Sequence, residues 1–181
     1  MTQHPLPMTD PDRTEFGFQR TVCACPECVQ NCRHLPGYLI PADLGRIQQH
    51  LAAGEDLLAW ARHHLRASPG AMVLHQGRAF RIPTLVPARR ADGACLFLAD
   101  QDRCQIHAVA PFGCAFFDAH QAHEEADRRS RRGLQAVAEA WRRGDPFAQV
   151  WRALHQAGLH SPPPEVCRRQ LHQATDNDQP P

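Results

Sequence analysis

Four cysteines occur within ten residues near the start of this 181-residue chain, and they constrain its fold more than any other feature. The segment from Cys23 to Cys32 reads Cys-Ala-Cys-Pro-Glu-Cys-Val-Gln-Asn-Cys. A hydrophobic core needs spaced apolar side chains and rarely needs clustered sulfurs, so packing does not explain the pattern. Cys25 and Cys28 form a C-x-x-C pair, a spacing that lets two sulfurs of one tight loop approach one metal ion. We interpret the segment as metal-binding, with reduced structural thiols or a redox-active pair as the alternatives.

A second group of cysteines follows at Cys95, Cys104 and Cys114. Three nearby thiolates of the first group need a fourth ligand, which the second group can supply across the fold. The first-choice metal ligands are Cys25, Cys28, Cys32 and Cys114. The second-choice ligands are Cys23, Cys95 and Cys104. Seven cysteines exceed the four that one zinc ion or one cubane cluster requires, so the number of metal ions stays open at this point.

The residues beside the cysteines leave the identity of the metal open. Thiolates suit both zinc and iron–sulfur clusters. The histidines near the two groups are candidate ligands, although a single histidine is more often structural; these are His34, His107 and His120. Arg33 and Arg103 each adjoin a cysteine, where they can offset thiolate charge or act as solvated surface residues. The eighth cysteine, Cys167, is interpreted as a bystander.

Composition argues against several classes of partner. A net charge of +1 gives no reason to expect nucleic acid or a membrane. The arginine-rich run at 128–132 follows acidic residues at helical spacing, so we interpret it as a solvated helix face. Residues 1–18 lack the apolar run of a signal peptide, and no segment reaches the roughly 18 apolar residues of a membrane span. We expect a cytoplasmic protein, in which ligation is favoured over disulfides, with an unknown protein or redox partner.

Hydrophobic periodicity predicts an α+β fold that is mainly α-helical, with short strands and loops around a cysteine-ligated metal site. The predicted helices cover about 41–53, 55–67, 123–143 and 145–157. Two strands are predicted between Met72 and Val86 about a turn at Gln76-Gly77, and further short strands at 95–98 and 105–107. We expect one cysteine-cluster domain at 21–160, between a flexible arm at 1–20 and a disordered tail at 161–181.

Both cysteine groups together resemble the YkgJ-like cysteine cluster family, a zinc- or iron-chelating domain named for a C-x-x-C-x-x-C-C motif. The resemblance covers about residues 22–120, through the stretches Cys25-Pro-Glu-Cys28-Val-Gln-Asn-Cys32-Arg33, Cys95-Leu-Phe-Leu, Cys104-Gln-Ile-His107 and Pro111-Phe-Gly-Cys114. Three positions depart from the family pattern: Asn31-Cys32 replaces the adjacent cysteines, His107 the usual tyrosine, and Ala110-Pro111 the usual Arg-Pro. By hypothesis, Cys23 compensates for the missing thiol.

The resemblance implies a metal-binding protein that holds an iron–sulfur cluster or zinc. One relative in this family is a flagellin lysine methylase with the same type of cluster, which leaves an iron–sulfur oxidoreductase or a transferase-related activity open here. The predicted function is therefore metal binding with a role in redox or group-transfer chemistry. The alternative is a zinc-stapled structural or interaction domain without catalysis. No Ser-His-Asp order, glycine-rich phosphate loop or paired carboxylates identify catalytic residues.

Overall fold

The computed structural model describes residues 16–169 apart from residues 22, 24, 100 and 101. Its elements are α1 (Pro26–His34), α2 (Pro41–Ala52), α3 (Leu57–His64), β1 (Leu65–His75), β2 (Arg78–Pro87), η3 (His107–Val109), α4 (Phe112–Ala115), α5 (His123–Arg143) and α6 (Pro146–Gln156). The strands β1 and β2 form a two-stranded antiparallel sheet. The predicted fold class, α+β and mainly helical, is confirmed.

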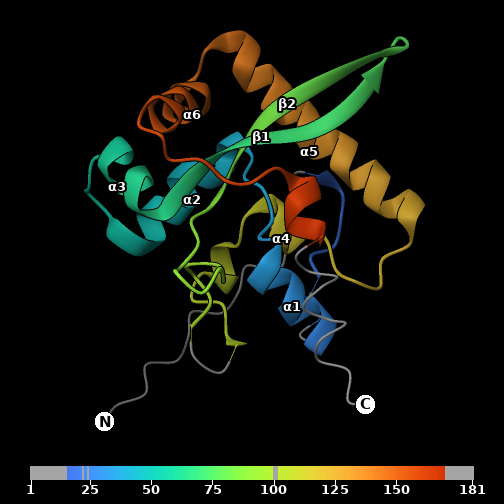
Figure 1. Ribbon diagram of the computed structural model, residues 1–181, viewed down its shortest axis with the longest axis horizontal. Coiled ribbons are helices and arrows are strands. Elements are labelled where there is room, and N and C mark those ends of the chain that lie inside the picture. Colours follow the sequence, from blue (N-terminus) through green and yellow to red (C-terminus); the bar gives the residue numbers. More distant parts are fainter. Residues whose placement is uncertain (1–15, 22, 24, 100–101, 170–181) are drawn as a thin grey trace.

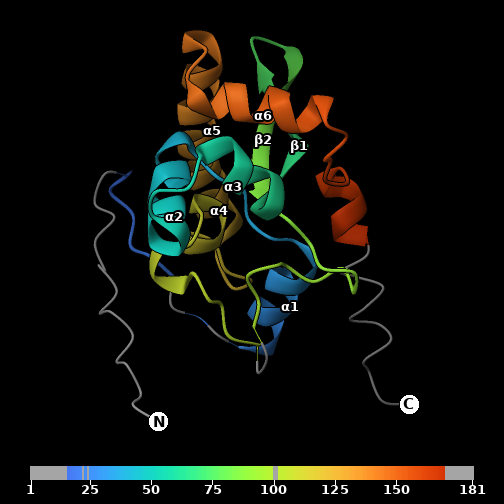
Figure 2. The same ribbon diagram turned by 90° about the vertical axis from the view of Figure 1, so that its left-hand side faces the viewer.

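We divide the molecule into two halves: the hairpin and α6 lie at one end, α1 lies at the other, and α4 lies between them (Figures 1 and 2). The helical half consists of α2, α3, the β1–β2 hairpin, α5 and α6. The cysteine half consists of residues 16–38 and 88–121, which include α1, η3 and α4. Seven of the eight cysteines belong to the cysteine half, where short elements are joined by turns.

The helices of the helical half begin and end at the signals that the sequence carries. The Asp56 carboxylate accepts hydrogen bonds from the backbone N–H groups of the first turn of α3, and Asp145 does the same for α6. Gly144 ends α5 with a φ of 65°, a left-handed conformation that glycine adopts without strain. The α2 helix begins at Pro41, where the missing N–H of proline costs no hydrogen bond.

The strand β1 begins earlier than predicted. The helix predicted over about 55–67 ends at His64, and Ser68-Pro69-Gly70, a sequence typical of helix ends, lies inside β1, where the register shifts between Ser68 and Ala71. Gly70 has a φ of 76°, and a Cβ there would lie 1.8 Å from the Ile82 carbonyl oxygen. The signal therefore marks a β-bulge and not a helix end.

Aromatic side chains fill the core, and two of them donate hydrogen bonds to the sheet. Trp60, Phe112 and Phe147 are almost completely buried. Trp141 of α5 and Trp151 of α6 stack edge to face with ring centroids 5.3 Å apart. Their indole N–H groups donate to the carbonyls of Pro83 and Ser68, both at 2.9 Å, so the two helices hold the two strands by directed hydrogen bonds.

Residues at both ends of the described chain make contacts with the core. Phe16 contacts Phe112 with ring centroids 4.9 Å apart. At the other end the Ser161 N–H donates to the Ala67 carbonyl at 2.9 Å, residues 164–169 are helical, and Cys167 is buried. The flexible arm at 1–20 and the disordered tail at 161–181 stay predictions, and the rest of both segments lies outside the described residues. Within the described residues, no helix has the length and apolar character needed to cross a bilayer.

Candidate metal centre

The first cysteine group forms a helix, α1, where the sequence suggested a loop. Cys25 is its N-cap residue, and the Cys25 sulfur accepts a hydrogen bond from the Cys28 N–H at 3.5 Å. Pro26 occupies the first helical position. Cys25 and Cys28 therefore lie at the N-terminal end of α1, and Cys32 lies one turn farther along.

Three cysteines and one histidine converge at this end of α1. One ligand atom from each of Cys23, Cys25, Cys28 and His120 lies within 4.8 Å of those of the other three. We call these residues the Cys3His set. Within the set, Cys25 Sγ and His120 Nε2 are 3.1 Å apart. Cys28 is buried, whereas Cys23 and His120 are exposed, so the set lies at the surface.

A single carboxylate brings Cys23 and His120 together. Asp118 accepts a hydrogen bond from the Thr21 hydroxyl at 2.7 Å and another from the His120 N–H at 2.9 Å. Thr21 lies two residues before Cys23, so both exposed ligands depend on this carboxylate for their position. The Thr21 hydroxyl also lowers the pKa of Asp118, which keeps the carboxylate ionised as a hydrogen-bond acceptor.

Two further contacts orient the ligands. The Ala119 N–H donates to Cys28 Sγ at 3.4 Å. Glu27 Oε2 lies 3.9 Å from His120 Nδ1, the ring nitrogen that does not face Cys25. A carboxylate beside the second ring nitrogen is a common feature of histidines that bind metals, because it sets the ring orientation and the tautomer.

The contact between Cys25 and His120 shifts the pKa of both groups. The hydrogen bond from the Cys28 N–H, followed by the contact with His120, lowers the pKa of Cys25 to about 6. The same contact with Cys25 raises the pKa of His120. Burial acts in the opposite direction on Cys28 and raises its pKa to about 12. The set thus contains one readily formed thiolate, and a bound cation would lower the cost of ionising the buried thiol.

The other four cysteines of the two groups lie elsewhere in the cysteine half: Cys32 on α1, Cys95 and Cys104 in the loop between β2 and η3, and Cys114 on α4. Within the described residues, the predicted first-choice set of Cys25, Cys28, Cys32 and Cys114 is not gathered within 4.8 Å, and its role as ligands stays a prediction. The short strands expected at 95–98 and 105–107 are replaced by turns and isolated bridges.

Burial raises the pKa of each of these four thiols. The pKa of Cys95 rises to about 12 and that of Cys104 to about 11. Cys32 is shifted in the same direction, and the pKa of Cys114 rises well above its usual range. Without a cation, all four therefore stay protonated at neutral pH.

The remaining sequence candidates have other roles. Arg33 forms an ion pair with Asp102 and so ties α1 to the loop that carries Cys104. Cys167 lies outside both cysteine groups, with the Arg89 guanidinium 3.0 Å from its sulfur. His107 is not part of the Cys3His set, and burial lowers its pKa.

His120 is the residue that sequence reasoning weighed but did not choose. It follows Cys28 by 92 positions, and nothing in the local spacing distinguishes it from His34 or His107. The useful signal would have been the Asp118-Ala119-His120 turn, because an aspartate can accept the N–H group two residues later.

The donor set fits the metals that thiolates favour. Three cysteines and one histidine are a known ligand set for tetrahedral structural zinc. The chain matches the sequence model of the CxxCxxCC family, described as a putative zinc- or iron-chelating domain, over residues 24–132. The match spans well over half of the chain and confirms the resemblance stated above; Cys23 lies just before it. No curated protein and no solved structure matches the chain.

Proposed function

We propose that this chain, which belongs to the CxxCxxCC family of zinc- or iron-chelating domains, binds a zinc ion through its Cys3His set. Metal binding itself follows from the family and from the convergence of the four ligands. The choice of zinc, and the role of the ion as a structural cross-link, are the proposal. The cytoplasm is the proposed location, because all eight cysteines are free thiols and a reducing compartment keeps them available.

The short distances between the ligand atoms of the Cys3His set support this proposal most strongly. With zinc–sulfur bonds of about 2.3 Å and a zinc–nitrogen bond of about 2.0 Å, the ligand atoms of a tetrahedral site lie roughly 3.5–3.8 Å apart. The four ligand atoms here already lie within 4.8 Å of one another. Small side-chain rotations are enough to close the set around one ion.

A zinc ion in this site would supply positive charge to three thiolates and close a long loop of chain. It would join the segment at Cys23 and α1 to the turn at His120, more than 90 residues later. The chain's own residues prepare this link: Asp118 positions both exposed ligands, and Glu27 faces the far nitrogen of the imidazole. Binding free energy at such a site becomes folding free energy of the segments that it joins.

Metal analysis of purified variants tests the proposal. We expect Cys25→Ser and His120→Ala to lose most of the bound zinc, whereas His120→Cys keeps it because a fourth thiolate also suits a tetrahedral site. Cys167→Ser is the matched control, since it removes a cysteine outside the set. Unchanged zinc content in both Cys25→Ser and His120→Ala would contradict the assignment.

A redox or group-transfer activity is the second candidate, and one cavity favours it. The cavity has a volume of about 860 Å³ and lies between the hairpin, α5 and residues 161–168. Its wall includes Gly37, whose N–H donates to Cys114 Sγ at 3.2 Å, and Gly113, the residue before Cys114. An unknown redox or protein partner belongs to this candidate. An anaerobic preparation whose visible absorption is bleached by dithionite would support it, and a colourless protein that contains zinc alone would contradict it.

A further inference from the structure

The outer edge of β1 already pairs with a third segment of the chain. The Ala67 N–H donates to the Leu159 carbonyl and the Ser161 N–H donates to the Ala67 carbonyl, both at 2.9 Å, as between two parallel strands. This pairing stops after Ser161 because three prolines follow, and a proline has no N–H group to donate. Towards the hairpin turn, the edge of β1 therefore continues without this partner.

The backbone groups of two residues farther along β1 point away from β2. The hairpin turn has two residues, so the residues that flank it, His75 and Arg78, form the hydrogen-bonded pair that closes the hairpin. Alternation along the strands then directs the N–H and C=O groups of Val73 towards β2 and those of Met72 and Leu74 away from it. Within the described residues, no group outside the hairpin bonds to the backbone of Met72 or Leu74.

The side chains of this open edge are apolar and exposed. Met72 is 52% exposed and Leu74 is 84% exposed. Both side chains lie on the same face of the sheet, because alternate residues of a strand share a face. Unpaired backbone groups beside exposed apolar side chains form a template for another strand, which proteins usually cover or protect with charge.

A cavity of about 860 Å³ runs along this edge, between the hairpin, α5 and residues 161–168 (Figure 1). Its wall includes Ser68 and residues 70–74 of β1. At about 3.3 Å per residue this stretch is roughly 20 Å long, enough for about six residues of extended chain. The far side of the cavity is closed by α5 and residues 161–168. That shape favours one extended segment over the hairpin of a second copy, which brings another strand about 4.8 Å beyond the first.

Both carboxylates in the cavity wall lie beside basic side chains. Glu165 pairs with Arg81 at 3.0 Å, and Arg81 also donates to the Gly70 carbonyl at 3.1 Å. Asp127 Oδ2 lies 3.6 Å from His123 Nε2. The Arg81 ion pair offsets the charge of Glu165, and His123 does the same for Asp127 whenever its imidazole is protonated.

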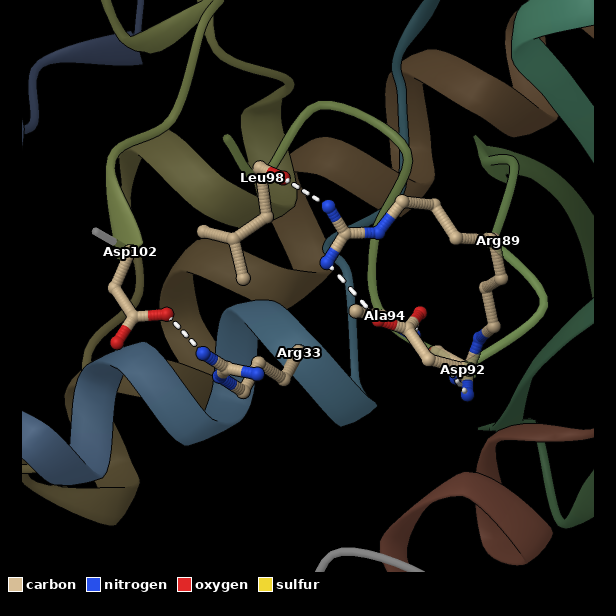
Figure 3. A network of polar contacts seen from close by, with 8 residues as sticks. Arg33, Arg89, Asp92, Ala94, Leu98 and Asp102 are labelled. Carbon is tan, nitrogen blue, oxygen red and sulfur yellow. Dashed lines mark hydrogen bonds and ion pairs between the residues drawn. The ribbon is translucent and has the colours of Figure 1, made fainter. Parts of the chain in front are cut away.

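Two arginines of the wall remain available to an occupant. Arg89, in the loop that follows β2 (Figure 3), is engaged within the protein, because it donates to the His34 carbonyl and lies 3.0 Å from Cys167 Sγ. Arg131 on α5 and Arg168 are exposed, and neither forms an ion pair with another residue in the described part of the chain. The charge of the cavity wall therefore complements an acidic segment.

We propose that the outer edge of β1 binds an extended segment of a partner protein as an added strand, and that apolar and acidic residues alternate in this segment. Hydrogen bonds to the backbone of Met72 and Leu74 supply affinity, and the side chains along the cavity supply selectivity. A small apolar ligand could fill the cavity but would leave these backbone groups unpaired. Binding of this kind needs neither zinc at the Cys3His set nor a reaction at the cavity.

Fluorescence anisotropy with labelled peptides and the zinc-loaded full-length chain tests the proposal. Two pools of eight-residue peptides have Val, Ile or Leu at alternate positions; the first has Asp or Glu between them and the second has Lys or Arg. We expect the acidic pool to bind at low salt about tenfold more tightly than the basic pool. N-methylation of every backbone nitrogen in the acidic pool should weaken its binding roughly tenfold, because it removes the N–H groups that pair with β1.

Variants of the edge locate the peptide on the protein. Leu74→Glu places a negative charge at the exposed edge of β1 and should weaken binding of the acidic pool by about tenfold. Phe80→Glu is the matched control, because Phe80 is also exposed, at 48%, but lies on β2. It should leave the binding unchanged.

Charge reversal tests the contribution of the two arginines. Arg131→Glu/Arg168→Glu should bind the basic pool more tightly than the acidic pool. The matched control is Arg132→Glu/Arg169→Glu, which makes the same change in net charge at neighbouring residues outside the cavity wall. This control should keep the preference for the acidic pool.

Three results would overturn the proposal. The first is no binding of the acidic pool, and the second is binding that survives both N-methylation and Leu74→Glu. The third is a dimer in sedimentation experiments that Leu74→Glu dissociates, because a second copy would then occupy the edge. Zinc is measured in the same samples, so failure of peptide binding in zinc-loaded protein leaves the metal assignment unaffected.

Discussion

The helices of the helical half and helix α1 of the cysteine half differ in how much apolar surface they bury. In the helical half, Trp60, Phe147 and Leu154 are at most 1% exposed, and each lies on the inward face of a helix with a clear apolar stripe. In the cysteine half, α1 buries only Cys28 among its nine residues. A nine-residue helix is marginal in water unless tertiary contacts stabilise it. Apolar burial therefore orders the helical half, whereas α1 depends on the contacts of its cysteines and on polar contacts such as the Arg33–Asp102 ion pair.

Removal of metal is the strongest test of this difference. We expect chelation to abolish amide-exchange protection in α1 and in the loop between β2 and η3, while α5, α6 and the hairpin keep theirs. Structural zinc sites contribute on the order of 10 kcal/mol, more than the whole stability of many small domains. Hydrogen exchange followed by mass spectrometry compares the two halves directly. Uniform loss of protection would show that the halves form one cooperative unit.

A cavity created by mutation in the helical half should lower the stability of the protein without releasing the metal. Trp60 is completely buried, and Trp60→Ala should lower the free energy of unfolding by about 3–5 kcal/mol, because a large cavity remains. The bound zinc per folded chain should not change. Trp60→Phe is the control: the Trp60 indole N–H finds no hydrogen-bond partner among the described residues, so its removal offsets part of the lost packing. Denaturant unfolding and metal analysis check both results, and loss of zinc from folded Trp60→Ala would contradict the separation.

Asp43 connects the two halves. Its carboxylate is completely buried and accepts hydrogen bonds from the Ile40 N–H at 2.9 Å and the Phe112 N–H at 2.7 Å. Arg46 also donates to it at 2.5 Å. Asp43→Ala leaves two buried N–H groups without this acceptor, so we expect a loss of about 2–4 kcal/mol.

The destabilisation of Asp43→Ala should extend to both halves, because Phe112 begins the helix that carries Cys114. Asp43→Asn keeps an acceptor oxygen and should lose less. Thermal unfolding observed through tryptophan fluorescence and through amide exchange near Cys114 distinguishes the halves. An Asp43→Ala protein that loses protection in α2 alone would show that this carboxylate does not connect them.

Sequence patterns predicted the helical half well for a physical reason. Helices such as α5 and α6 form where apolar residues repeat at helical spacing and where Gly144 and Asp145 supply local end signals. Such information lies within a few residues of each element. The exception is Ser68-Pro69-Gly70. Its sequence is typical of a helix end, but these residues pair with β2 and form a β-bulge.

For the cysteine half, the sequence identified the candidate ligands but not which of them lie close together. Spacing identified the seven cysteines as candidate ligands, yet it could not show that Cys23, Cys25 and Cys28 gather with His120. The partner of Cys25 lies 95 residues away at His120 and is positioned by Asp118. Long-range pairing of this kind leaves no periodic trace in the sequence. The confirmed family identifies the chemistry, and the three-dimensional arrangement supplies the grouping.

Asp118 of the cysteine half can be compared with Asp145 of the helical half, because both carboxylates accept a hydrogen bond from a backbone N–H two residues later. Asp118→Ala removes the acceptor shared by the Thr21 hydroxyl and the His120 N–H, so we expect roughly 10- to 100-fold weaker zinc binding with little change in global stability. Asp118→Asn should lose less, since an amide can still accept from one partner and donate to the other.

The matched control for Asp118→Ala is Asp145→Ala, which removes a carboxylate that accepts from the Phe147 N–H at 2.9 Å. Its cost should be about 1 kcal/mol of stability, with no change in zinc affinity. Competition titrations with a chromophoric zinc chelator measure the affinities, and denaturant unfolding measures the stabilities. If Asp118→Ala behaves like Asp145→Ala in both measurements, Asp118 is an ordinary turn residue and the polar ties of the cysteine half do not position its ligands.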